Sequence, residues 1–178
     1  MIDLRDLRRR LIIPHVGSIA VDYTMGNGHD TLMLAELFEC VYAFDIQEKA
    51  LENTGKLLSE HNYLDKCTLI LDSHSNAKKY ITEPVNAGIF NLGYLPGGDK
   101  TLTTRAETTI KAVEAAVDLM ADGGIVFIAV YPGHEEGKLE GELLEKKYAE
   151  LDRRNYCFSS FKILNSPSSP YFLIIERK

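Results

Sequence analysis

The chain has 178 residues, of which 45% are hydrophobic and 26% are charged, and its formal net charge is −6. This length predicts a single domain over residues 1–178. No apolar run approaches the ~20 residues of a membrane-spanning helix. The charged start of the chain also lacks the apolar core of a secretory signal, so we expect a cytoplasmic protein with no membrane partner.

The negative net charge disfavours non-specific binding of long nucleic acid, but it is compatible with a small surface patch that binds one RNA loop. Basic residues gather in two places, at Arg5, Arg8, Arg9 and Arg10 and at Lys146, Lys147, Arg153 and Arg154. Acidic residues are interspersed in both clusters, so we predict a solvated helix face for each.

Apolar runs and helical patterns alternate along the chain. Strands are predicted at residues 19–23, 40–45, 68–71, 85–92, 125–131, 156–164 and 171–176. Helices are predicted at residues 30–38, 47–61, 104–120 (ending near Gly123 and Gly124) and 137–153.

Helices separate most of the first five strands, which predicts a parallel sheet covered on both faces. The turn between the last two strands is too short for a parallel crossover, so this pair is antiparallel. The pattern therefore predicts a Rossmann-like α/β fold: a mostly parallel seven-stranded sheet with a C-terminal antiparallel hairpin, the plan of class I S-adenosylmethionine-dependent methyltransferases. Ligands of such sheets bind beyond the carboxyl ends of the strands.

The first strand is followed by a glycine-rich turn and a helix start that suit a cofactor. Gly26 and Gly28 allow a tight turn and a close approach of the backbone to a ligand, or the turn is purely structural. The third glycine of a dinucleotide motif would fall at Thr31 and is absent, which disfavours NAD. The cofactor contacts expected here are Asp22, Thr24, Gly26, Asn27, Gly28, Asp30 and Thr31.

Polar residues also follow the second and third strands. Asp45, 17 residues after Gly28, is placed to accept ribose hydroxyls, or alternatively to cap the next helix. Ile46 and Gln47 follow it and are also expected to contact the cofactor, as is Asn91 after the fourth strand. Asp72, Ser73 and His74 form a turn that either meets an adenine amino group or has no ligand. Together with the first turn, these strand ends favour an adenosyl cofactor.

The loops after the fourth and fifth strands are predicted to face the substrate. The Asn91 amide oxygen suits a target N–H group, and Tyr94 suits packing on a flat substrate. His134 either orients the substrate or caps a helix. Methyl transfer needs mainly in-line positioning and a free lone pair. No metal site is expected, because the histidines lack the spacing of metal ligands and no cysteines are paired.

Four segments, DYTMGNGHDT (22–31), AFDIQ (43–47), NLGYLPGGDK (91–100) and YPGHEEG (131–137), resemble the bacterial rRNA methylase family. This family includes the tRNA 5-aminomethyl-2-thiouridine methyltransferase of Gram-positive bacteria. The resemblance covers nearly the whole chain and implies N-methylation of that nucleoside at the tRNA wobble position, with S-adenosylmethionine as donor and the anticodon stem-loop as RNA partner.

By the same resemblance, Gly26, Asn27, Gly28, Asp45 and Gln47 contact the cofactor, while Asn91, Tyr94 and His134 line the substrate side. A homodimer is expected because small methyltransferases of this type often pair. Tyr23 departs from the family pattern, in which a small residue is expected. Its ring is predicted either to enter the core or to narrow the cofactor mouth.

Three other functions compete with this interpretation. An rRNA methyltransferase would modify ribosomal RNA, and a small-molecule methyltransferase would act without RNA. A silent adenosyl-binding module would bind the cofactor without turnover. The acceptor of the proton that the amine loses is open, with Asp99 and His134 as candidates.

Overall fold

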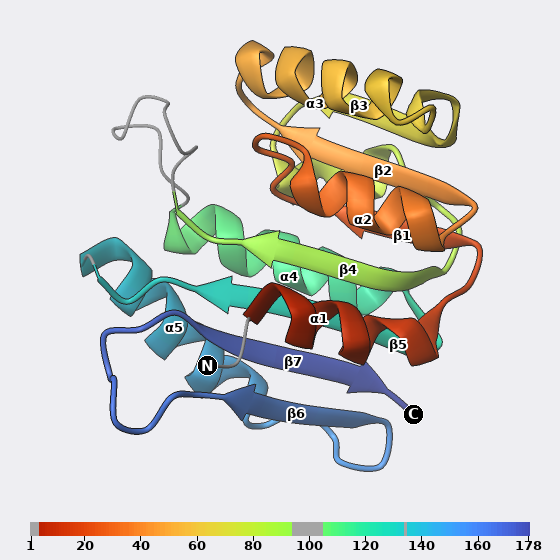
Figure 1. Cartoon of the computed structure of the whole chain (residues 1–178). Coiled ribbons are helices and arrows are strands. Elements are labelled where there is room, and N and C mark those ends of the chain that lie inside the picture. Colours follow the sequence, from red (N-terminus) through yellow and green to blue (C-terminus); the bar gives the residue numbers. More distant parts are fainter. Residues whose placement is uncertain (1–3, 94–104, 134) are drawn as a thin grey trace.

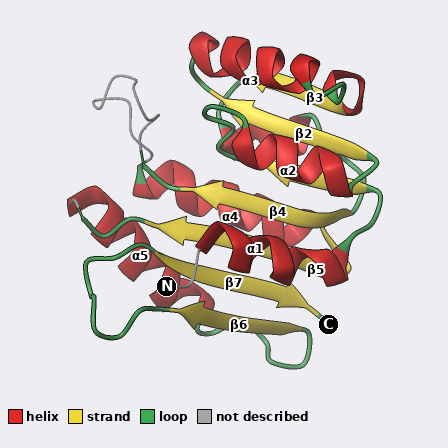
Figure 2. Cartoon of the chain, in the orientation of Figure 1, coloured by secondary structure: helices red, strands yellow, loops and turns green. Residues whose placement is uncertain are grey.

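A computed structural model describes residues 4–93, 105–133 and 135–178 of the chain. Within these ranges, seven strands form one sheet in the order β3-β2-β1-β4-β5-β7-β6 (Figures 1 and 2). The strands are β1 (Ile19–Asp22), β2 (Cys40–Asp45), β3 (Cys67–Leu71), β4 (Val85–Asn91), β5 (Met120–Val130), β6 (Tyr156–Phe161) and β7 (Tyr171–Arg177).

The α-helices are α1 (Leu4–Ile12), α2 (His29–Leu37), α3 (Glu48–Glu60), α4 (Ala106–Leu119) and α5 (Glu135–Tyr148). Short 3₁₀ helices are η1 (Ile13–His15), η2 (Leu64–Lys66) and η3 (His74–Lys79). No helix in the described ranges is long and apolar enough to cross a membrane.

The strand directions confirm the predicted plan. β1 to β5 pair in parallel, and β7 pairs antiparallel with both β5 and β6. Strands buried on both faces need apolar residues at nearly every position, which explains the continuous apolar runs of β4 and β5.

Helices cover both faces of the sheet. Buried side chains of α1, α2 and α3, among them Ile12, Leu34 and Leu58, form a core against one face. Buried side chains of α4 and α5, among them Val113 and Leu144, form the core against the other face. Figure 1 shows α1 and α2 in front of the sheet and α4 and α5 behind it. The carboxyl ends of the parallel strands therefore open between two helical layers.

Two predicted helix ends are wrong, and β6 ends at Phe161 instead of at residue 164. Helix α4 ends at Leu119, because Met120 already pairs with Val85 of β4 and a register shift follows. Gly123 (φ +72°) and Gly124 lie inside that irregular part of β5 and do not end the helix. Helix α5 ends at Tyr148 instead of near residue 153.

Candidate active site

The turn after β1 is held against two neighbouring strands and against α3. The amide of Tyr23 donates to Ile89 O at 2.9 Å, and that of Met25 donates to Phe44 O at 2.8 Å. Gly26 and Gly28 both have positive φ, +55° and +83°. A Cβ on Gly28 would lie 2.7 Å from Thr54 Oγ1 and 3.0 Å from its Cα. Glycine is therefore required here both for the backbone conformation and for the contact with α3.

Asp22 and Thr31 lie beneath this turn, and neither has exposed surface. Asp22 accepts hydrogen bonds from the Thr24 amide at 3.1 Å and from Thr31 Oγ1 at 2.7 Å. Burial raises the pKa of Asp22, and the negative charge of Asp30 raises it further. Both residues were expected to contact the cofactor. Because neither side chain has accessible surface, both support the turn from below in this structure.

Asp45 ties the β1 turn to the start of α3. One carboxylate oxygen accepts from the Gly26 amide and the other from the Gln47 amide, both at 3.0 Å. Burial raises the pKa of Asp45, while these amides lower it. A carboxylate has about four acceptor positions, so its two oxygens keep acceptor capacity for the hydroxyls of a ribose. Ile46 beside it is 60% exposed and offers an apolar surface at the same edge.

The turn after β3 is internally hydrogen-bonded. Asp72 accepts from the Ser73 amide at 2.7 Å, from Asn76 Nδ2 at 2.9 Å and from Tyr80 OH at 2.9 Å. The hydrogen bond from Asn76 is the main cause of a lowered Asp72 pKa. Nδ1 of His74 lies 3.1 Å from the Tyr23 carbonyl oxygen, which can only accept, so Nδ1 carries the proton.

Tyr23 points into the core. It is 1% exposed and stacks on Phe90 with a centroid distance of 4.3 Å and an interplanar angle of 2°. The ring fits because Gly88 lies beneath it; a Cβ there would come within 3.0 Å of Tyr23 Cε2. Tyr23 therefore does not narrow the cofactor mouth.

Asn91, at the end of β4, is held by three groups. Its backbone amide donates to Thr24 Oγ1 at 2.6 Å, and its Nδ2 donates to Asp30. Its Oδ1 lies 3.4 Å from Tyr131 OH, which donates to it. Asp30 lies in the first turn of α2, so the cofactor turn and the predicted substrate residue form one connected network.

Two residues of this network, Arg8 and Tyr131, were not among the predicted site residues. Arg8 forms an ion pair with Asp30 and is 5% exposed, so the prediction of a solvated face is wrong at this position. Arg8 shares a helix face with Leu7, Leu11 and Ile12. An arginine inside such an apolar stripe was the available signal.

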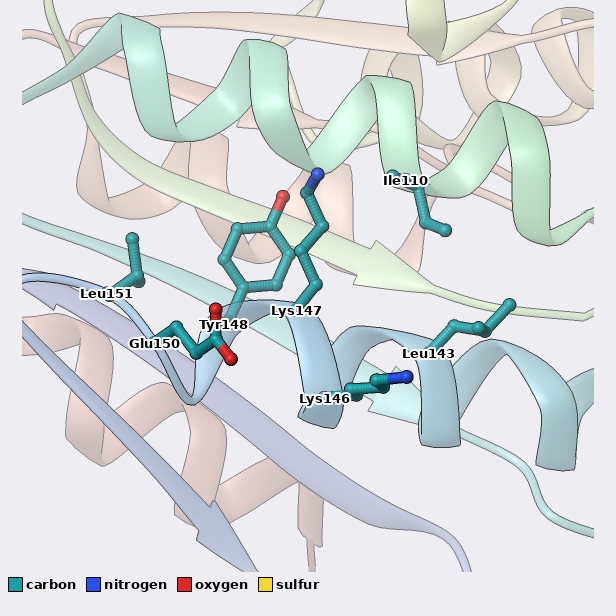
Figure 3. Close-up of a pocket in the computed structure, with 7 residues that line it drawn as sticks. All are labelled: Ile110, Leu143, Lys146, Lys147, Tyr148, Glu150 and Leu151. Carbon is teal, nitrogen blue, oxygen red and sulfur yellow. The ribbon is translucent and has the colours of Figure 1, made fainter.

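The predicted residues Tyr94 and His134 lie outside the described residues, as does Asp99. Among the described residues, Asn27 lies in the β1 turn and accepts from Asn53 Nδ2 at 3.0 Å. A separate cavity of about 570 Å³ lies between α4 and α5. It is lined by Ile110, Leu143, Lys146, Lys147, Tyr148, Glu150 and Leu151 (Figure 3). None of the predicted site residues lines it.

Comparison with known proteins identifies relatives along most of the chain. Residues 41–177 match the family described as "Putative rRNA methylase". An Arabidopsis thaliana relative, the chloroplastic tRNA (mnm5s2U34)-methyltransferase, is 33% identical over 91% of this chain. The chain spans 64% of the length of that relative.

Two solved structures have nearly the same fold. A "putative rRNA-methylase" from Clostridium thermocellum is 38% identical, with a TM-score of 0.95, covering 100% of this chain and 99% of its own. A "putative methyltransferase" from Streptococcus mutans in complex with SAH is 35% identical, with a TM-score of 0.90 and the same coverage. The predicted class I methyltransferase fold is confirmed, and the chain belongs to the rRNA methylase family.

Proposed function

We propose that the chain methylates the amine of 5-aminomethyl-2-thiouridine at the wobble position of tRNA. The product is the 5-methylaminomethyl form, and S-adenosylmethionine is the donor. The observation that carries this proposal is the Asn91 amide, whose Nδ2 is occupied by Asp30 while its Oδ1 remains an acceptor at the end of β4.

The residues present fit an adenosyl donor. Asp45 keeps acceptor capacity for ribose hydroxyls, and exposed Ile46 offers an apolar surface for the base. Gly26 and Gly28 place no side chain at two positions of the β1 turn, so the backbone there can approach a ligand closely. S-adenosylmethionine, when bound, supplies an electrophilic methyl group. The S. mutans relative was solved with SAH, the product of such a donor.

Asn91 supplies what an amine substrate needs. Its Oδ1 accepts one N–H of the target, which directs the nitrogen lone pair away from the amide and toward the cofactor turn. An aliphatic amine is mostly protonated at neutral pH and must lose a proton before it attacks. Candidate acceptors of this proton are Asp99 and His134. Tyr94 is the candidate for packing on the uracil ring.

The choice of RNA rests on the relatives. The Arabidopsis protein is named for position 34 of tRNA, which lies in the anticodon loop, whereas the family description refers to rRNA. A single loop is a small target that suits a chain of 178 residues with a net charge of −6. The homodimer and the cytoplasmic location expected from the sequence stay predictions.

The experiment uses tRNA and rRNA from a strain that lacks this gene, incubated with purified protein and S-adenosylmethionine. Nucleoside mass spectrometry should show 5-aminomethyl-2-thiouridine converted to its N-methyl form in tRNA. Methylation of rRNA alone would favour the ribosomal alternative. Cofactor binding with neither RNA methylated would refute an RNA substrate and favour a small molecule or a silent adenosyl-binding module.

A further inference from the structure

We propose that Arg8 of α1 is a positioning residue for methyl transfer, which acts through Asp30 to fix which atom of the Asn91 amide faces the substrate. The inference rests on the proposed function, in which Asn91 Oδ1 accepts a hydrogen bond from the target amine. It assigns a part in the active site to α1, a helix that holds none of the site residues predicted from the sequence.

The network runs from the helix to the end of β4. Arg8 Nη2 is paired with Asp30 Oδ1, and Asn91 Nδ2 donates to Asp30 Oδ2. The Arg8 side chain is 6% exposed and that of Asp30 is 13% exposed. A nearly buried ion pair is little screened by solvent. Each oxygen of Asp30 therefore has its own partner, and the carboxylate connects a fixed cation to the amide.

The direction of the amide follows from hydrogen-bond chemistry. An ionised carboxylate only accepts hydrogen bonds, so the NH₂ group of Asn91 must face Asp30. Oδ1 then points to the other side, where it lies 3.4 Å from Tyr131 OH. Without Arg8, the Asp30 carboxylate would lose the partner that fixes its position, and the Asn91 amide could then turn round. In that orientation NH₂ would face the amine, and two donors would oppose each other.

A second carboxyl group lies close to this ion pair. Asp22 is fully buried near Asp30, and the charge of Asp30 contributes to the raised pKa of Asp22. Two adjacent carboxyl groups in a buried site repel each other when both are charged. Arg8 cannot give up its own proton and pairs only with Asp30 among the described residues. It therefore offsets this repulsion at Asp30 and keeps the Asp30 carboxylate beside Asn91.

Steady-state kinetics with methyl-acceptor tRNA provide the first test. In Arg8→Ala, kcat should fall about 10- to 100-fold, the loss expected from a misplaced reacting group. The Kd for S-adenosylmethionine should stay within a factor of about two, because Asp45 and the glycines are untouched. Arg8→Lys keeps the charge but not the planar fork, so it should recover part of kcat.

Arg9→Ala is the matched control. Arg9 lies next to Arg8 on the same helix and pairs with Glu36 at 2.6 Å, but its side chain is 42% exposed. This variant should retain the kcat of the unchanged protein. Unchanged kcat in Arg8→Ala would overturn the proposal. Equal losses of kcat in Arg8→Ala and Arg9→Ala, in proportion to the fall in their melting temperatures, would also overturn it. If Arg8→Ala fails to fold, unchanged kcat in Arg8→Lys is the contradicting result.

A second measurement does not depend on activity. The side-chain amide signal of Asn91 in an ¹H–¹⁵N NMR spectrum, assigned by its loss in Asn91→Ser, should shift in Arg8→Ala and stay in place in Arg9→Ala. An Asn91 signal that is the same in Arg8→Ala as in the unchanged protein would contradict the proposal. If the unchanged protein fails to methylate tRNA, the proposed function is refuted, while this signal still reports whether Arg8 orients Asn91.

Discussion

Replacement of Asp45 by alanine should weaken cofactor binding and loosen the β1 turn together. The carboxylate accepts hydrogen bonds from the Gly26 and Gln47 amides, both at 3.0 Å, and keeps acceptor capacity for the hydroxyls of a ribose. A hydrogen bond to a charged group contributes about 1.5–3 kcal/mol. Loss of one ribose contact therefore raises the Kd for S-adenosylmethionine by about 10- to 150-fold. Separately, loss of the hydrogen bonds from the Gly26 and Gln47 amides should lower the free energy of unfolding by about 1–3 kcal/mol.

Isothermal titration calorimetry with S-adenosylmethionine and S-adenosylhomocysteine measures the first effect, and denaturant unfolding without ligand measures the second. Glu48→Ala is the control, because it removes an exposed carboxylate from the first turn of the same helix. It should leave both quantities within about 0.5 kcal/mol of the unchanged protein.

The two readouts separate the two roles of Asp45. A stability loss with unchanged cofactor affinity would mean that Asp45 only caps the turn, and the ribose assignment would be wrong. Unchanged affinity and unchanged stability would refute the reasoning from the structure as well.

Three further predictions concern the same strand ends. Asn91→Ala should abolish turnover and leave cofactor affinity nearly intact by calorimetry; loss of cofactor binding would contradict its role on the substrate side. Asp22→Asn should flatten the pH dependence of stability. The pKa of Asp22 is raised from 3.8 to about 7 by burial, so between these values the folded state keeps a proton that the unfolded state has lost. The stability of the unchanged protein should therefore fall as pH rises through this window, by up to about 1.4 kcal/mol per pH unit. Denaturant unfolding at several pH values should show this component missing in Asp22→Asn, and an identical slope in both proteins would refute it. Tyr23→Phe should raise the free energy of unfolding by about 1 kcal/mol, because the buried hydroxyl has no hydrogen-bond partner among the described residues; a loss of more than about 1 kcal/mol would reveal a partner for it.

Strand periodicity and the short last turn were enough to predict the sheet. The apolar runs of β4 and β5 have the composition of strands buried on both faces. The connection before β7, residues 162–170, is too short for a parallel crossover, so β6 and β7 pair antiparallel. Helix ends were harder to predict. Met120 is an ordinary helix residue, and only its pairing with Val85 across the sheet shows where β5 begins.

The expectation that ligands bind beyond the carboxyl ends of the strands placed Asp45 and Asn91 correctly at that edge of the sheet. Parallel strands bring their carboxyl ends together regardless of the conformation of the loops between them. This expectation could not distinguish exposed from buried positions within one turn. Asp22 and Thr24 are two residues apart, yet Asp22 is covered completely. Arg8 was missed because its partner is 22 residues away and belongs to another helix.

The central claim is that this chain methylates an exocyclic aliphatic amine of one anticodon nucleoside. The most direct measurement is the intact mass of a synthetic anticodon stem-loop with 5-aminomethyl-2-thiouridine at position 34, after incubation with the protein and S-adenosylmethionine. A mass gain of one methyl group, absent when 2-thiouridine replaces the aminomethyl nucleoside, is the predicted result. No gain on the aminomethyl RNA, or an equal gain on both RNAs, would contradict the claim.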